Sequence, residues 1–460
     1  MERYLRGLGP VAYGRGMWGR RGPAPRRLAA RDVVATFDSP AGAYVHVPFC
    51  EWICPFCPYN KVRAEASLAD RYFAALNREV DGYVAAYQSR FAGPFTSLYV
   101  GGGTPTLYPE RLAELVARIP VAGELAIEVL PTHGTPQRLD QLADAGFTAV
   151  SIGAQSFHDP VLARLHRPHD AAASRRAVEN ARDRFACVDV DLIVDVAVED
   201  DDALRGSFLA DVRTCFELGV DQVSTYPLMR FGYTPFGTAR HDRAREHAVL
   251  AEVTELAGAH GYERRSVWTF NRKGSTTYTS ITRPRFLGMG AGSSSFAGKD
   301  FYVNHFGLGS YSEALDHDRL PIARWLHLGA WAGGAYDAFW QAYSGRVRVG
   351  GLEAAYGPAV ATSTRALLGP LAAAGLLRRS DGDFWLTAKG FDVYHDLERL
   401  VTYQLIEPLW AQMLGEHVAE GATVRRDPQR PAPAEWVTPD QGRRGRAWSL
   451  ASRVLERPVG

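Results

Sequence analysis

The sequence is short of sulfur, with only five cysteines and five methionines in 460 residues. An odd number of cysteines cannot all pair, and three of them lie within eight residues, at Cys50, Cys54 and Cys57. This pattern excludes a disulfide scaffold and favours a metal site in a reducing cytoplasm.

The chain also lacks an excess of charge of either sign. Its 52 Lys and Arg residues against 51 Asp and Glu leave a formal net charge of +1, so no bulk field attracts nucleic acid or an anionic membrane. No apolar run reaches the ~18 residues that a membrane-spanning helix needs, and the N-terminus has no apolar stretch typical of a signal peptide. We therefore expect a cytoplasmic monomer with no membrane span and no nucleic-acid partner.

What is present is the composition of a globular protein, with 46% hydrophobic and 22% charged residues, which excludes global disorder. Changes in pattern along the chain predict four parts. These are a basic N-terminal arm or lid over residues 1–40, a core over 41–300, a C-terminal domain over 301–420 and an Arg-rich tail over 421–460.

The core alternates between strands and helices. The predicted strands are Ala43–Val47, Ser97–Val100, Leu125–Leu130, Thr148–Ile152, Val188–Val196, Gln222–Leu228 and Arg264–Phe270. The predicted helices between them are Leu68–Tyr87, Pro109–Ile119, Pro136–Ala145, Ala171–Phe185, Ala203–Leu218 and Ala239–His260. Repeated βαβ units imply an α/β protein with a parallel sheet. Seven strands favour a full or partial TIM-like barrel, and a Rossmann sheet is the alternative.

Beyond Gly298 the pattern becomes that of a small, helix-rich, winged-helix-like module. Helices are predicted at Leu352–Tyr356, Ala359–Gly375 and Phe391–Leu405, with short strands around Leu376–Leu377 and Phe384–Leu386.

The strongest chemical signal is the run Cys50-Glu-Trp-Ile-Cys54-Pro-Phe-Cys57. Thiolates are soft ligands that suit iron–sulfur clusters, zinc or Cu(I). Three thiolates can converge on an iron–sulfur cube and leave one iron with an open coordination position. A zinc loop would need a fourth ligand, and the remaining cysteines, Cys187 and Cys215, are predicted to be small buried hydrophobes.

Two further features accompany this loop. A glycine-rich turn, Gly101–Thr106, follows a predicted strand directly and lets the backbone approach a ligand closely. Polar residues mark three successive predicted strands: Glu128 lies near the end of the first, Gln155 follows the second and Asp191 interrupts the third. The C-terminal strand ends of a parallel barrel line its active site, so we expect these side chains there.

Together these residues carry a family resemblance. The stretch from Tyr44 to Cys57 resembles the signature of radical S-adenosylmethionine (SAM) proteins of the HemN-like group, which includes oxygen-independent coproporphyrinogen III oxidases, the haem chaperone HemW and class C methyltransferases. The likeness covers about residues 41–410 and ends in a HemN-type C-terminal domain. It continues through Gly101–Thr106, Ser151–Phe157, Arg164–Arg167, Asp191–Ile193, Leu287–Gly292, Ala374–Leu377 and Leu386–Gly390.

The resemblance implies two cofactors, a [4Fe–4S] cluster held by Cys50, Cys54 and Cys57, and SAM. An electron from the cluster would cleave SAM to methionine and a 5′-deoxyadenosyl radical that abstracts hydrogen. Positions that contact the cluster-bound SAM are matched by Tyr44, Gly102 and Glu128. Positions that contact a second SAM are matched by Phe56, Gly103, Thr104, Gln155, Arg167 and Asp191.

Two departures from the group bear on the reaction. Tyr59 stands where the oxidases carry another cysteine, and Asp191-Leu-Ile is not followed by the group's usual Gly-Leu-Pro-x-Gln. We therefore predict a class C methyltransferase, or a methylene-transferring cyclopropanase, acting on an aromatic or heteroaromatic small molecule. The alternatives are a coproporphyrinogen III oxidase and a HemW-like haem chaperone. The expected partners are the small-molecule substrate and an electron donor such as flavodoxin or ferredoxin.

Overall fold

The computed structural model describes residues 21–22, 28–194, 201–234, 243–275 and 284–419. The predicted Arg-rich tail lies outside these residues, as does most of the predicted N-terminal arm. Inside that arm the structure has a short helix, α2 (Ala30–Val34), whose Val33 and Val34 are buried. The proposed division into domains stays a prediction.

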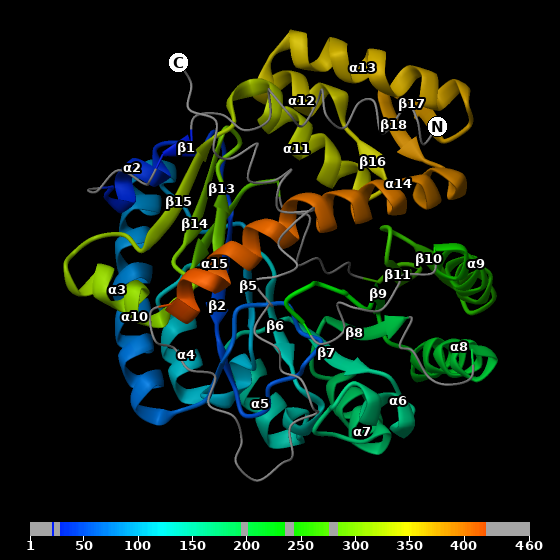
Figure 1. Cartoon of the computed structure of the whole chain (residues 1–460), viewed down its shortest axis with the longest axis horizontal. Helices are drawn as coiled ribbons and strands as arrows, with labels where there is room; N and C mark the ends of the chain where they lie inside the picture. Colours follow the sequence, from blue (N-terminus) through cyan, green and yellow to red (C-terminus); the bar gives the residue numbers. More distant parts are fainter. Residues whose placement is uncertain (1–20, 23–27, 195–200, 235–242, 276–283, 420–460) are drawn as a thin grey trace, which may run out of the picture.

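The centre of the molecule is a block of seven parallel strands within a larger mixed sheet (Figure 1). In spatial order they are β12 (Phe286–Met289), β2 (Gly42–Val47), β5 (Leu98–Gly102), β6 (Leu125–Val129), β7 (Ala149–Gln155), β8 (Cys187–Val194) and β9 (Gln222–Pro227). From β2 to β9 the spatial order follows the chain order, as in a barrel, and does not reverse direction as in a Rossmann sheet. The α/β barrel prediction is confirmed in its partial form.

The sheet does not close within the described residues, because antiparallel strands continue it at both edges. On one side β9 is followed by β11 (Thr269–Arg272) and β10 (Tyr262–Arg264). On the other, β12 is followed by β13 (Ser294–Phe296), β14 (Asp300–Asn304), β15 (Ile322–His327) and β1 (Arg21–Gly22).

The predicted strand Arg264–Phe270 is therefore wrong. Its residues form a hairpin, because the Ser266 hydroxyl is hydrogen-bonded to Thr269 Oγ1 at 2.6 Å and the backbone N–H of Thr269 donates to Ser266 Oγ. Such local bonds compete with a continuous strand. The seventh parallel strand is instead β12, a short segment whose Gly288 gives it little strand propensity.

Helices cover the outer face of the parallel strands (Figure 1). They are α3 (Ala66–Phe91), α4 (Pro109–Ala117), α5 (Pro136–Asp144), α6 (Asp159–Arg164), α7 (Ala171–Ala181), α8 (Asp201–Leu218) and α9 (Arg243–Ala259). The part of the predicted helix Ala239–His260 before residue 243 lies outside the described residues. On α3 apolar and aromatic residues recur at helical spacing and form one buried face, since Tyr72, Leu76, Val80, Tyr83 and Tyr87 are all at most 1% exposed.

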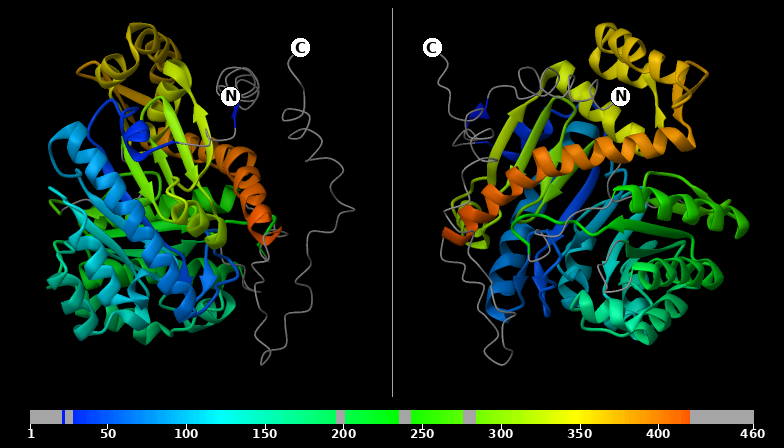
Figure 2. Two further views of the ribbon diagram at one scale, coloured as in Figure 1. Left: turned by 90° about the vertical axis from the view of Figure 1, so that its left-hand side faces the viewer. Right: turned by 45° about the vertical axis from the view of Figure 1, so that its right-hand side comes forward.

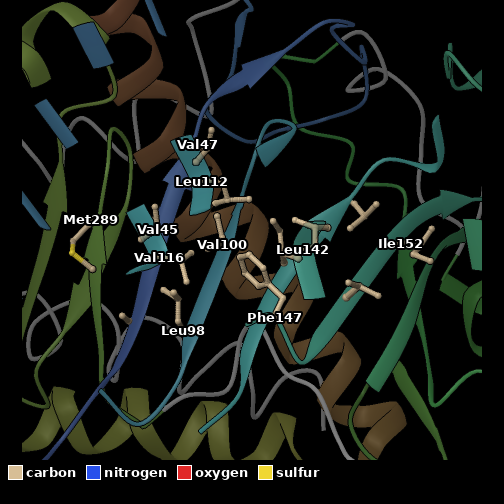
Figure 3. Packing of buried hydrophobic residues seen from close by; sticks show 14 of the residues in the cluster. Val45, Val47, Leu98, Val100, Leu112, Val116, Leu142, Phe147, Ile152 and Met289 are labelled. Carbon is tan, nitrogen blue, oxygen red and sulfur yellow. The ribbon is translucent and has the colours of Figure 1, made fainter. Parts of the chain in front are cut away.

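The main core lies between these helices and the sheet (Figure 3). Strand residues such as Val45, Leu98 and Val100 pack there against helix residues such as Leu112 and Val116. This packing fixes the strands rigidly, so the side chains at their ends keep defined positions.

A C-terminal module has a small core of its own. It contains α11 (Gly329–Tyr343), α12 (Val349–Tyr356), α13 (Pro358–Ala373) and a three-stranded sheet of β16 (Arg346–Val347), β17 (Leu377–Ser380) and β18 (Asp383–Leu386). A helix α10 (Leu308–Asp316) precedes it.

From this module a long helical stretch runs back across the sheet (Figure 2). It consists of α14 (Ala388–Val401), a π-helical turn (Thr402–Ile406) and α15 (Glu407–Ala419). The predicted helix Phe391–Leu405 captures only part of it. Turns of this kind are frequent at functional sites.

Candidate active site

The three clustered cysteines lie in one loop after β2. Cys50 ends the short strand β3 (Phe49–Cys50), which pairs with β4 (Val62–Arg63), and the backbone N–H of Cys57 donates to the carbonyl of Cys54 at 3.3 Å. None of the three forms a disulfide. Burial, together with the neighbouring Cys57, raises the pKa of the Cys50 thiol to about 12, whereas Thr104 and Lys61 oppose the rise.

The soft donor chemistry of these three thiols suits an iron–sulfur cluster. Within the described part of the chain, no group of three His, Cys, Asp or Glu side chains is arranged to hold a single metal ion. The thiols nevertheless influence one another electrostatically, and Lys61 and Arg167 favour their ionised forms. In an iron–sulfur cube each thiolate binds a different iron, so the ligands lie further apart.

The glycine-rich turn packs directly against this loop. A Cβ at Gly103 would lie 2.6 Å from the Phe49 carbonyl oxygen and 2.9 Å from Cys50 Sγ. The backbone N–H groups of Gly103 and Thr104 donate to the carbonyls of Val47 and Phe49. Glycine is therefore needed here so that the turn and the cysteine loop can approach each other.

The predicted contacts of the first SAM form one polar wall. The ring of Tyr44 stacks on that of Tyr99 at 5.7 Å, the Tyr99 hydroxyl donates to Glu128 Oε1, and the backbone N–H of Gly102 donates to Glu128 Oε2 at 3.1 Å. Burial raises the pKa of Glu128 to about 7, while the hydrogen bond from Tyr99 lowers it. The structure thus brings Tyr44, Gly102 and Glu128 together.

Three of the predicted contacts of the second SAM form another group. Arg167 donates from Nη2 to the Gly153 carbonyl at 2.7 Å and from Nη1 to Cys54 Sγ at 3.3 Å. Gln155 ends β7 with a φ of 70°. Asp191 on β8 faces Arg167; burial raises the pKa of Asp191 to about 6, while the hydrogen bond with Ser151 and the charge of Arg167 oppose the rise. Phe56 lies about 6.0 Å from the guanidinium of Arg167. Of the nine predicted SAM contacts, only Tyr44, Gly102 and Glu128 line the cavity described next.

A cavity of about 490 Å³ extends from this polar wall to the C-terminal helices. Its charged lining residues within the described chain are three carboxylates, Glu128, Glu246 and Glu398, and one guanidinium, Arg399. Aromatic side chains dominate the rest of the lining: Tyr44, Tyr59, Tyr99, Tyr226, Phe231, Trp268, Phe286, Phe301, Tyr336, Phe339, Trp340, Tyr343, Tyr403 and Trp410. Concave, mostly apolar sites with few polar groups are typical ligand sites.

The C-terminal part of this cavity was not predicted from the sequence. On α14, Arg399 donates to Glu246 of α9 at 3.1 Å, and His395 is hydrogen-bonded to the same carboxylate oxygen at 2.9 Å. Glu398 accepts hydrogen bonds from Trp268 and Thr402, and burial raises its pKa to about 7. The alternation of apolar and charged residues on helix 388–401 is the one signal that points to this face.

His46 on β2 links Tyr44 to Asn60 through hydrogen bonds that its position in a strand did not predict. Its Nε2 lies 2.8 Å from the Asn60 carbonyl oxygen, so Nε2 carries the proton, and its Nδ1 accepts from the Tyr44 hydroxyl at 2.7 Å.

The two cysteines outside the loop, Cys187 and Cys215, are fully buried, as predicted for small hydrophobes.

Comparison with known proteins agrees with this geometry. The model of the radical SAM superfamily matches residues 44–205. The haem chaperone HemW of Mycobacterium tuberculosis is 33% identical over 318 residues, which cover 63% of this chain and 78% of the relative. The oxygen-independent coproporphyrinogen III oxidase of Pseudomonas aeruginosa is 27% identical over 66% of this chain and 72% of its own. The solved structure of the Escherichia coli coproporphyrinogen III oxidase HemN superposes with a TM-score of 0.68 at 22% identity, covering 85% of this chain and 97% of that one.

The chain belongs to the radical SAM superfamily, in the group of HemN and HemW. This confirms the resemblance and, with it, SAM and a [4Fe–4S] cluster as its cofactors. The prediction of methyl transfer gains no support from these relatives, whose names favour the two alternatives. None of the described helices is long and apolar enough to cross a membrane.

Proposed function

We propose that this radical SAM protein binds haem, or a closely related tetrapyrrole, in the aromatic cavity beside its SAM site. The observation that carries the proposal is the cavity itself, which joins the wall of Tyr44, Gly102 and Glu128 to an apolar aromatic chamber. A flat apolar macrocycle gains stacking and burial energy in such a lining. The similarity to HemW supports the same ligand class.

In this proposal Cys50, Cys54 and Cys57 hold the cluster, and Tyr44, Gly102 and Glu128 contact the SAM bound to it. The cluster, when present, supplies the electron that splits SAM into methionine and a 5′-deoxyadenosyl radical. The chain orients SAM through the Glu128 carboxylate, whose oxygens are fixed by Tyr99 and Gly102. The aromatic lining excludes water from the space in front of it.

The charge of the lining favours haem over coproporphyrinogen III. Coproporphyrinogen III carries a propionate on every pyrrole, so carboxylates would enter the cavity on all sides. Haem carries its propionates on one edge, which can stay in water while the rest is buried. Among the described lining residues three are carboxylates and Arg399 alone is basic, and Arg399 is already bonded to Glu246. Burying unpaired carboxylates beside other carboxylates is costly.

A second candidate is methyl transfer to an aromatic small molecule. The observation that favours it is the proximity of Gln155, Arg167 and Asp191, three predicted contacts of a second SAM that come from separate segments. A second SAM would serve as the methyl donor. Formation of S-adenosylhomocysteine separates this candidate from the first.

The test is an anaerobic titration of the reconstituted protein with haem, followed by the quenching of tryptophan fluorescence. Ala335 lines the cavity from α11 and its side chain is exposed, so Ala335→Trp should fill the cavity without disturbing the core. We expect stoichiometric haem binding by the wild type, at least tenfold weaker binding by Ala335→Trp, and no change in Ala74→Trp, a matched exposed position on α3. Equal haem binding by all three proteins would contradict the proposal.

A further inference from the structure

Two aspartates of β8 lie on either side of one serine hydroxyl in the interior of the sheet. Ser151 on β7 pairs with Asp189 across the parallel ladder. Its Oγ lies 3.1 Å from Asp189 Oδ2 and 2.8 Å from Asp191 Oδ2. Asp189 is 0% exposed and Ser151 2% exposed, whereas Asp191 is only half-buried.

The environments of the two carboxyl groups differ. Ser224 on β9 lies 2.9 Å from both oxygens of Asp189, and among the described residues Asp189 forms no ion pair. Asp191 instead faces the guanidinium of Arg167. A buried carboxylate without a cation is costly in its ionised form.

The number of available protons determines the direction of the two hydrogen bonds between Ser151 and the aspartates. A serine hydroxyl has one proton, so Ser151 can donate to one carboxylate only. If both aspartates were ionised, the other carboxylate would face the lone pairs of the hydroxyl oxygen at 3.1 Å or less. One aspartate must therefore be protonated and donate to Ser151.

We infer that Asp189 is a positioning residue kept as a neutral acid, which donates to Ser151 so that Ser151 donates to an ionised Asp191. The order Asp189, Ser151, Asp191 forms a relay from the fully buried Asp189 to the half-buried Asp191, which faces Arg167. Its consequence for SAM binding rests on the proposed contact between Asp191 and a second SAM. The relay itself depends only on the buried geometry.

The titration behaviour of the two groups supports this order. Burial, and then the charge of Asp191, raise the pKa of Asp189 well above its usual range. Burial raises the pKa of Asp191 to about 6, while Ser151 and Arg167 oppose the rise. Burial likewise raises the pKa of Asp211, another buried aspartate, to about 6, so neither Asp191 nor Asp211 should be protonated at a pH of about 8.

Infrared spectroscopy tests the relay directly. Full-length protein is labelled with ¹³C-carboxyl aspartate, so that the buried glutamates do not contribute. At a pH of about 8 we expect one labelled carbonyl band from a protonated carboxyl group, present in the wild type and absent from Asp189→Asn. Absence of the band from the wild type, or its persistence in Asp189→Asn, would overturn the inference.

Equilibrium dialysis with SAM tests the consequence. Asn resembles a neutral acid in shape and can still donate to Ser151, whereas Leu cannot. Asp189→Leu and Ser151→Ala should each weaken the second SAM site about tenfold, and Asp189→Asn should restore it to within about twofold. Ser174→Ala, which removes an equally buried hydroxyl on α7, should leave SAM binding unchanged.

The outcomes separate the relay from the proposed function. If Asp191→Ala leaves SAM binding unchanged while the infrared band behaves as expected, the relay stands and the proposed role of Asp191 in SAM binding is wrong. If Asp191→Ala weakens SAM binding but Asp189→Leu and Ser151→Ala do not, the positioning role of Asp189 is wrong.

Discussion

Arg167 donates a hydrogen bond from Nη1 to Cys54 Sγ across 3.3 Å. The bond joins the cysteine loop to the strand end where Gln155 lies, because the other terminal nitrogen of Arg167 donates to the Gly153 carbonyl. A guanidinium beside a thiol favours the thiolate. One side chain therefore connects the cysteine loop to the group of predicted contacts of the second SAM.

Replacing Arg167 tests the two-SAM candidate. Arg167→Ala removes a group that can clamp a carboxylate with two hydrogen bonds. We expect the cluster and the formation of 5′-deoxyadenosine to remain, while S-adenosylhomocysteine falls roughly 30-fold or more. Both products are followed separately in anaerobic turnover with dithionite. Arg164→Ala, an exposed position on α6, is the control, and a proportional fall of both products would refute the two-SAM reading.

The cluster ligands are tested by substitution of each cysteine. Cys50→Ala, Cys54→Ala and Cys57→Ala should each abolish the cluster after anaerobic reconstitution, since three ligands leave none to spare. Cys187→Ala and Cys215→Ala should retain it, because both thiols are fully buried away from the loop. Iron and sulfide per chain are the measurement, and loss of the cluster in either of the latter variants would show a wrong ligand assignment.

Gly103→Ala tests the close approach between the glycine-rich turn and the cysteine loop. The added Cβ would lie 2.6 Å from the carbonyl oxygen of Phe49 and must displace backbone. We expect the cluster content to fall severalfold while the far-ultraviolet circular dichroism stays that of the wild type. Gly206→Ala on α8, where a Cβ meets nothing within 4 Å, should keep the cluster and stabilise the helix by about 0.5–1 kcal/mol. An unchanged cluster in Gly103→Ala would contradict the packing argument.

Two glutamates, the buried Glu79 and the half-buried Glu128, give a matched prediction for the pH dependence of stability. Burial raises the pKa of both Glu79 and Glu128 from 4.5 to about 7. Since the folded-state value lies above the unfolded one, their contribution to stability is fully present below a pH of about 4.5 and is lost as the pH rises through about 7. Urea unfolding without added cofactors measures this effect. Between a pH of about 4.5 and a pH of about 7, the free energy of unfolding should fall by about 3 kcal/mol less in Glu79→Gln and in Glu128→Gln than in the wild type.

The same pair separates structure from function. Glu79 is bonded to Tyr311, Asn304 and the Gly290 N–H on the α3 side of the sheet, so Glu79→Gln should leave SAM binding unchanged. Glu128→Gln should weaken it about tenfold, because a carboxylate bonds an ammonium group more strongly than an amide does. Equal SAM affinity in both variants would remove Glu128 from the site.

The sequence predicts best the helices and strands that have a periodic local pattern, and least well the contacts between segments that are distant in the sequence. Local periodicity is enough to predict six of the seven strands and the buried face of α3. The spacing of the cysteines predicts their loop, and its place near the end of a predicted strand points to Glu128. The strand β12 and the C-terminal lining of the cavity were missed, because Gly288 and Trp410 are placed by contacts with residues far away in the sequence. The bond between Ser151 and Asp189 likewise depends on strand register, which no local pattern encodes.

One cavity connects the wall of Tyr44, Gly102 and Glu128 to the aromatic chamber that we propose to bind haem. The direct test measures 5′-deoxyadenosine formation from SAM with dithionite, with and without haem, in the wild type and in Ala335→Trp. We predict that haem changes the rate severalfold in the wild type and leaves Ala335→Trp unaffected. If haem binds to the wild type but the rate stays the same, or if haem changes the rate equally in both proteins, the cavity does not couple the two sites and the account is wrong.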